Sequence, residues 1–139
     1  MSIQVTDVEV ARQLTEIRTH LNAASTLHCY KNDYTPIPDS AGGNFTEANF
    51  NGYASESLVG NWGAVTEAAD GKWYIEATPV TFTKTAGGVD NTIYGWWIDD
   101  GTNVVMAERL ATPIVITTDA LPFRLTIRYT HEAKIQGCS

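Results

Sequence analysis

The side chains with the widest chemical range in this chain are its histidines and cysteines. The histidines are His20, His28 and His131, and none stands in the His-x-x-x-His or Cys-x-x-Cys spacing of a zinc site. His28 and Cys29 are adjacent, so on a strand their side chains point to opposite faces. We therefore expect neither a metal nor another cofactor, and we interpret Cys29 as a small core residue. A bridge from Cys29 to Cys138 stays open, although synthesis in the cytoplasm favours free thiols.

Carboxylates gather in the loops, with an adjacent pair at Asp99 and Asp100. Calcium binds loop oxygens, but no Asp-x-Asp-x-Asp-Gly loop is present, and Asp100-Gly101 is an ordinary hairpin signal. The sequence also lacks Gly-x-Ser-x-Gly and the glycine-rich patterns that bind phosphate. These observations favour a turn over a calcium site and a protein that is not an enzyme.

Trp96 and Trp97 are adjacent, so on a strand one should enter the core while the other lies on the outer face or at an interface. An exposed tryptophan could stack on a sugar ring. It could equally contact another subunit, because tryptophan is enriched at binding hot spots. We prefer the subunit contact and keep carbohydrate binding as the alternative.

One helix is predicted, over residues 6–24, to position an apolar stripe. Thr6 and Glu9 have the spacing of a capping box at its start. The stripe consists of Val10, Leu14, Ile17 and Leu21. A lone helix of this length is marginal in water, so the stripe must pack on something. Its own β-domain and a neighbouring subunit or particle surface are both open, and we include the stripe among the predicted interface residues.

From residue 26 onward, short β-prone runs alternate with turn signals about every ten residues. The predicted strands are residues 27–30, 53–59, 62–67, 72–77, 80–85, 93–98, 103–110, 114–117 and 123–130. This pattern predicts an all-β fold, an antiparallel β-sandwich or jelly-roll-like domain over residues 26–139, with the helix in residues 1–25 before it. Arg124 and Arg128 fall on one face of the last strand and could meet acidic residues of a partner.

The stretch 44–54 should organise one edge of the core. Phe45 and Phe50 are too large and apolar for a solvated loop, so we expect them to plug the core. Asn51-Gly52 predicts a tight turn, since both residues tolerate positive φ. A strand is expected to begin at Tyr53.

This stretch, together with residues 30–39, resembles a family of small virion proteins of tailed bacteriophages. In that family a loop of the type Asn-Asp-x-Thr-Pro-x-Pro-Asp precedes Phe-Thr-Glu-Ala-x-Phe-x-Gly-Tyr, and both are present here. Further similar pieces are residues 81–83, 94–97 and 107–109, so the resemblance covers most of residues 27–125. The motif carries no chemistry. The resemblance implies a β-sandwich structural protein of the phage particle, decorating its head.

The net charge of the chain restricts the classes of molecule that it is expected to bind. The 139 residues carry a net charge of −7, which argues against nucleic-acid binding, where phosphates require a basic face. It favours a basic protein partner. No apolar run approaches the roughly 18 residues that cross a membrane, and the N-terminus lacks a secretory pattern. We expect synthesis in the host cytoplasm and residence in the virion.

The resulting hypothesis is a non-enzymatic capsid decoration or cement subunit that stabilises the phage head through protein–protein contacts. Its expected partners are the major capsid protein and copies of itself, for which a trimer is one arrangement because local three-folds of a capsid invite it. A carbohydrate-binding module displayed on the virion and a structural protein of the tail or baseplate are the alternatives.

Overall fold

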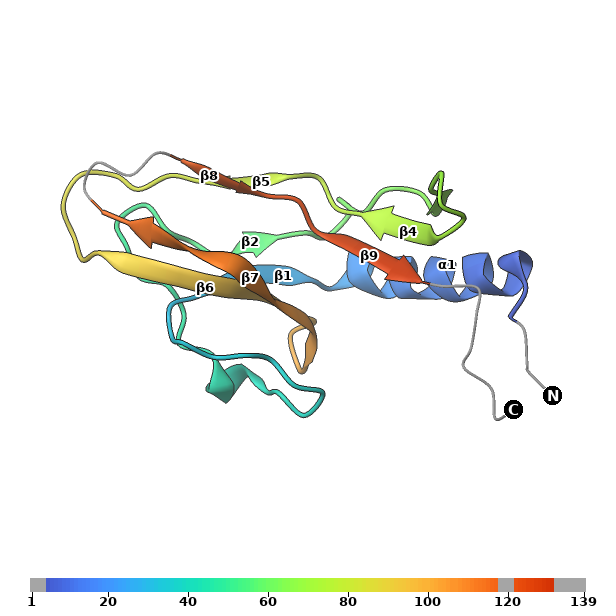
Figure 1. The fold of residues 1–139 in the computed structure, drawn as a ribbon, viewed down its shortest axis with the longest axis horizontal. Coiled ribbons are helices and arrows are strands. Elements are labelled where there is room, and N and C mark those ends of the chain that lie inside the picture. Colours follow the sequence, from blue (N-terminus) through green and yellow to red (C-terminus); the bar gives the residue numbers. More distant parts are fainter. Residues whose placement is uncertain (1–4, 118–121, 132–139) are drawn as a thin grey trace.

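One N-terminal helix is followed by nine strands in the part of the chain that the structure, a computed structural model, describes: residues 5–117 and 122–131 (Figure 1). The helix is α1 (Asp7–Ala23). The strands are β1 (Thr26–Tyr30), β2 (Glu56–Ser57), β3 (Thr66–Glu67), β4 (Trp73–Glu76), β5 (Val80–Phe82), β6 (Asn91–Asp99), β7 (Val104–Ile116), β8 (Phe123–Leu125) and β9 (Arg128–His131). A 3-10 turn, Gly42–Asn44, interrupts the loop after β1.

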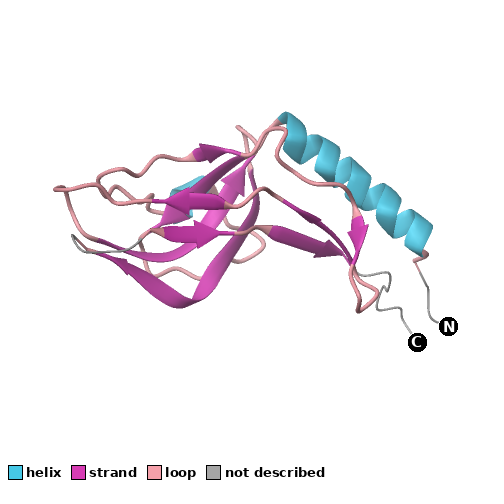
Figure 2. Ribbon diagram, turned by 90° about the horizontal axis from the view of Figure 1, so that it is seen from above, coloured by secondary structure: helices cyan, strands magenta, loops and turns pink. Residues whose placement is uncertain are grey.

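Helix α1 begins where the sequence predicts it. Thr6 is the N-cap, and its hydroxyl accepts a hydrogen bond from the Glu9 backbone N–H at 3.3 Å. The Glu9 carboxylate does not complete the box but bonds the Arg12 guanidinium at 2.5 and 2.8 Å. These bonds lower the pKa of Glu9 to about 2. Figure 2 shows the helix at one end of an elongated molecule.

The described strands form three antiparallel sheets, with orders β2-β1-β6-β7, β3-β4-β9 and β5-β8. The main hydrophobic core takes buried side chains from α1 and from all three sheets, among them Leu14, Leu27, Ile75, Phe82 and Ile98. An all-β fold with one N-terminal helix is thus confirmed. Its finer assignment to a sandwich or jelly roll stays a prediction.

Several predicted strand boundaries are wrong, and the strands expected over residues 62–67 and 80–85 are reduced to β3 (Thr66–Glu67) and β5 (Val80–Phe82). The strand expected over residues 53–59 shrinks to β2, because the Leu58 N–H bonds the Ser25 carbonyl beside the helix end. The strands at 103–110 and 114–117 are one strand, β7, because both ends pair with β6. The strand at 123–130 splits in two, because β8 pairs with β5 and β9 pairs with β4.

Strand β7 accommodates two irregularities along its pairing with β6. Ile98 pairs with Met106 and Asp99 with Val104, so Val105 is an extra residue. Ile93 pairs with Ile114 and Gly95 with Arg109, so residues 110–113 bulge out. Pro113 lies in the second bulge, where its missing N–H costs no ladder hydrogen bond.

Candidate functional site

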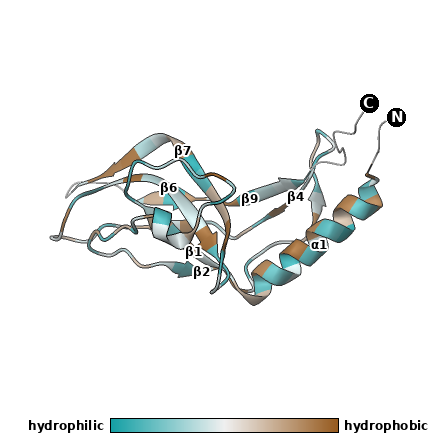
Figure 3. Ribbon diagram, turned by 90° about the horizontal axis from the view of Figure 1, so that it is seen from below, coloured by the Kyte–Doolittle hydropathy of each residue, from teal (hydrophilic) through white to brown (hydrophobic). Residues whose placement is uncertain are grey.

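The predicted helix stripe packs on its own chain. Val10, Leu14 and Leu21 are at most 1% exposed and belong to the main core, with Ile17 partly buried against it. The Arg18 guanidinium adds hydrogen bonds to backbone carbonyls at residues 62 and 63, at 3.0 and 2.7 Å. Figure 3 shows α1 beside β4 and β9. Of the two alternatives the own-domain contact is confirmed, so the three buried positions are not a free interface.

Neither tryptophan is the outward one that we expected. Trp96 and Trp97 are 7% and 6% exposed. They do face opposite sides, since Trp96 enters the main core and Trp97 enters a second cluster with Tyr30 and Phe45. The prediction of an exposed tryptophan is wrong because the loop after β1 brings Phe45 over Trp97, with stacked rings 4.8 Å apart. A sugar-stacking platform at Trp97 is therefore covered.

The stretch 44–54 behaves as a core plug. Phe45 and Phe50 are 7% and 2% exposed, as predicted. Gly52 has φ 89°, and a side chain there would lie 2.5 Å from the Thr83 carbonyl, so the predicted turn requires glycine. Tyr53 does not begin a strand. Its hydroxyl instead donates to Glu47 at 2.8 Å and accepts from the Cys29 N–H at 3.0 Å, while burial raises the Tyr53 pKa well above its usual value.

The two predicted arginines are exposed on consecutive strands but differ in their contacts. Arg128 donates to Glu76 at 2.7 Å and lies over the Tyr74 ring at 3.8 Å. The Glu76 bond raises the Arg128 pKa. Arg124 makes no hydrogen bond or ion pair with any described residue. Of these two arginines, Arg124 is thus the one that no described residue pairs, and it could meet an acidic group of a partner.

Sequence reasoning missed a polar cluster around His28. Its Nδ1 contacts the Glu47 carboxylate at 2.5 Å, its Nε2 contacts the Asp99 carboxylate, and its ring stacks on Trp97 at 4.5 Å. Glu47 and Asp99 lie 19 and 71 residues away in sequence, so no local signal could find them. The cluster fastens the loop after β1 to β6. Within residues 5–117 and 122–131, no three His, Cys, Asp or Glu side chains gather to hold a metal.

The adjacent aspartates close the β6–β7 hairpin, as the turn interpretation predicts. The Asp99 carboxylate accepts a hydrogen bond from the Gly101 N–H at 2.9 Å. The Asp100 carboxylate accepts from the N–H groups of Asn103 and Thr102 at 2.8 and 3.0 Å, which lowers the Asp100 pKa. Gly101 has φ 93°, the positive value that such turns need.

The outer edge of β7 is the docking surface that the structure offers. β7 ends the four-stranded sheet, and no described strand pairs with its outer side. Four residues, 106–109, lie in regular register between the two bulges; we call them the edge segment. The described residues place a groove on each side of it, one predominantly apolar and the other of mixed polarity. Unpaired strand edges of this kind are templates for strand addition.

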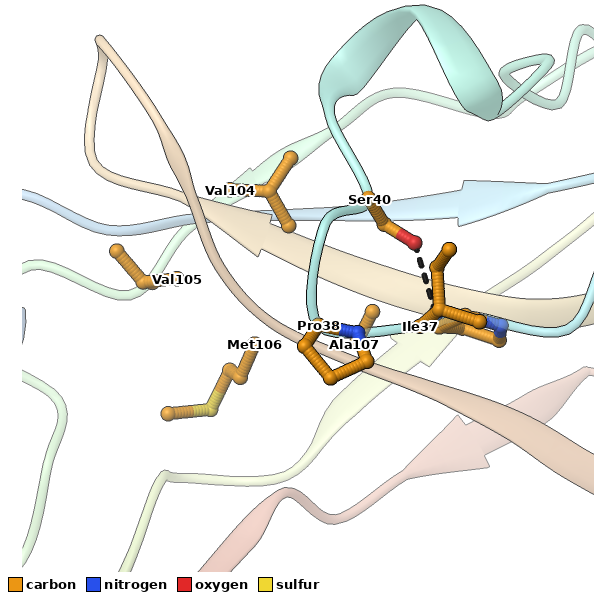
Figure 4. Close-up of a pocket in the computed structure, with 8 residues that line it drawn as sticks. Ile37, Pro38, Ser40, Val104, Val105, Met106 and Ala107 are labelled. Carbon is orange, nitrogen blue, oxygen red and sulfur yellow. Dashed lines mark hydrogen bonds between the residues drawn. The ribbon is translucent and has the colours of Figure 1, made fainter.

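Groove A lies between β7 and the loop after β1 and has a volume of about 290 Å³. It is lined by Pro36, Ile37, Pro38, Ser40, Val104, Val105, Met106 and Ala107 (Figure 4). The Ser40 hydroxyl accepts a hydrogen bond from the Ile37 N–H at 2.9 Å, which holds the loop in shape. Ile37 itself is 59% exposed. The groove therefore has one fixed wall and one exposed apolar rim.

Groove B lies between β7 and α1 and has a volume of about 370 Å³. It is lined by Glu16, Ile17, His20, Leu21, Val105, Met106 and Tyr129. The bulge at Val105 explains why two consecutive residues of β7 both line the floor of groove B. Val105 and Met106 both pack toward the main core, whereas Val104 and Ala107 pack toward the Trp97 cluster. Figure 4 shows Val105 and Met106 projecting to the same side of β7.

The charges along the edge segment are unequal. Arg109 is neutralised by Asp33 at 2.7 Å and lies over the Tyr94 ring at 5.3 Å. Glu108 is exposed and makes no ion pair with any described residue. The edge segment therefore presents one carboxylate that no described residue neutralises, between the two grooves.

Among the described residues, no helix has the length and apolar character needed to span a membrane. No protein-family model, curated protein or solved structure matches the chain. The resemblance to virion proteins of tailed phages thus stays an expectation drawn from the sequence.

Proposed function

We propose that this protein is a non-enzymatic structural subunit of a tailed-phage particle, a decoration or cement protein on the outside of the head. The observation that carries the proposal is the outer edge of β7 with a groove on either side, of which the one beside α1 is predominantly apolar. This surface supports a function that consists of binding neighbouring protein subunits. The phage context comes from the sequence motif in residues 44–54 and the loop before it.

The β7 surface suits protein contact on physical grounds. Val104, Val105, Met106 and Ala107 are all half-buried, so a partner could still remove apolar area from water. Such burial contributes about 25 cal/mol per Å². Free backbone N–H and C=O groups on a strand edge add hydrogen bonds that fix the orientation of the partner. The major capsid protein is the proposed partner, with copies of this chain as further neighbours on the shell.

The two alternatives fare differently. A carbohydrate-binding role relied on an exposed tryptophan, and both candidate residues are buried, so we do not develop it. A place in the tail or baseplate would use the same kind of contact. Only the position of the protein in the particle separates that alternative from the head.

Purified particles of the phage that encodes the chain test the proposal. We expect a density map to show the protein over the head, and quantitative mass spectrometry to count copies in a fixed ratio to the capsid protein. Particles without it should release their DNA at a lower temperature. Its absence from particles would refute the proposal, and a few copies confined to the tail would replace the head with the tail.

A further inference from the structure

The edge segment is short because both of its ends are irregular. Val105 interrupts the register on one side and residues 110–113 on the other, so only residues 106–109 can pair regularly. Natural proteins use bulges and proline to stop open-ended pairing of sheet edges. A four-residue edge between two bulges therefore limits an incoming strand to a defined length and position.

We propose that the edge segment binds a short extended segment of the capsid shell protein, with apolar residues opposite Met106 and Ala107 and lysine or arginine opposite Glu108. This inference rests on the proposed function and names the partner's chemistry. Side chains of an added strand alternate between the two faces of the sheet. Those on the α1 side would enter groove B, and those on the other side would enter groove A.

A second copy of the chain does not satisfy the same edge. In a two-fold antiparallel pair, directly opposite residues share a face, so their numbers must differ by an even amount. Within residues 106–109, Glu108 could then face only Glu108 or Met106 of the second copy. The first arrangement opposes like charges, and the second sets a carboxylate against an apolar side chain. Both are unfavourable.

A basic residue in the partner removes this conflict. Glu108 has no partner among the described residues, whereas the neighbouring Arg109 is already paired with Asp33. Opposite charges directly across a strand pair stabilise it. The net charge of −7 further favours approach of a basic segment. Charge and groove positions thus select a strand that is apolar opposite Met106 and Ala107 and basic opposite Glu108.

A synthetic peptide with valines at the positions opposite Met106 and Ala107 and a lysine at the position opposite Glu108 is the probe in solution. We expect it to bind the full chain and to protect from hydrogen exchange those backbone amides of residues 106–109 that point away from β6. The same peptide with a central valine replaced by proline keeps its charge but cannot complete the strand, so it should not bind. Glu108→Lys should weaken binding about tenfold or more, about 1.4 kcal/mol. Glu56→Lys is the matched control, because Glu56 is exposed on β2 at the opposite edge of the same sheet.

Three results would overturn the inference: equal binding of the proline peptide, equal weakening by Glu56→Lys, or protection of amides elsewhere. A dimer of the chain that Met106→Lys dissociates would replace the shell protein with a second copy. Particles provide an independent readout. If the Glu108→Lys protein occupies the head in full copy number, the proposed function stands and this inference fails. If the unaltered protein is absent from particles, the proposed function fails.

Discussion

At the scale of single residues, Cys29 shows how position suppresses reactivity. The side chain has no exposed surface, and burial raises the pKa of its thiol to about 12. Because the thiolate is the reactive form, we expect no modification of Cys29 by an aromatic disulfide reagent at pH 8 in a Cys138→Ser background. Denaturant should make it react at once. Rapid modification of the native protein would show that the strand opens readily.

The same shift gives Cys29 a pH dependence with a defined sign. The ordinary pKa of a cysteine thiol is 9.0, and the unfolded thiol loses its proton around that pH. The folded Cys29 thiol, with its pKa raised to about 12, still holds its proton there. The folded state therefore binds more protons between pH 9 and about 12, and this contribution to the unfolding free energy declines as the pH rises through that range. Cys29→Ala in the same background should flatten the decline.

Asn91 is a buried amide that no sequence motif singled out, yet it shapes the stretch 44–54. Its side-chain oxygen accepts from the N–H groups of Asn49 and Phe50 at 2.8 and 3.1 Å. Its amide donates to the Asn49 side chain at 2.9 Å. Asn91→Ala would leave the buried Phe50 N–H unpaired, at about 1–3 kcal/mol, whereas the groups of the exposed Asn49 can bond water. We expect chemical denaturation to show a loss of unfolding free energy in that range or above.

The control for Asn91 is Asn61→Ala. Asn61 is exposed, and its side chain donates one long hydrogen bond of 3.5 Å to the Ser57 carbonyl. We expect its effect to stay within about 0.5 kcal/mol, as for ordinary surface substitutions. Equal losses for the two variants would mean that burial of the Asn91 amide is not what matters.

At the scale of elements, Gly95 marks the point where three strands crowd together. β6 pairs with β1 through Tyr30 and with β7 through Arg109 at this residue. A methyl group on Gly95 would collide with the Tyr30 ring and the Glu108 carbonyl oxygen. We expect Gly95→Ala to lower the unfolding free energy by about 1–3 kcal/mol, measured by denaturant titration, because overpacking strains a dense core. Gly43→Ala, with open space around it, should change little.

Elements that depend on local chemistry were predictable from the sequence. Thr6 caps α1, Asn51-Gly52 turns the chain and Asp100-Gly101 closes a hairpin, because each signal acts over a few residues. Elements that depend on distant partners were not. β7 continues past Pro113 because β6 supplies partners on both sides of the bulge, and nothing local to the proline announces this.

At the scale of the whole molecule, the candidate site was hidden from the sequence for the same reason. Val105 and Met106 read as ordinary strand residues, and only the register with β6 turns both toward α1. Ile17 was placed correctly on an apolar stripe, but its position at the rim of groove B depends on how α1 meets the sheets. Likewise, the burial of Trp97 depends on the loop after β1, which places Phe45 over the Trp97 ring.

The shared core predicts that helix and sheets unfold together. Leu14 on α1 is fully buried in the same cluster as residues of all three sheets. Leu14→Ala should therefore lower the unfolding free energy by about 2–5 kcal/mol. Far-ultraviolet circular dichroism and tryptophan fluorescence should shift by the same amount, because one cooperative transition moves both signals.

Val8→Ala provides the comparison on the same helix. Val8 is 82% exposed, so its truncation should leave both transitions in place. If Leu14→Ala instead moved only the dichroism signal, α1 would be melting separately from sheets that remain folded. The helix would then be bound weakly enough to detach from the sheets. Its apolar stripe could in that case pack on a neighbouring subunit instead of on its own domain. If the two transitions coincide, α1 stays folded as long as the sheets do. Groove B, whose wall is formed by α1, is then present throughout the folded state.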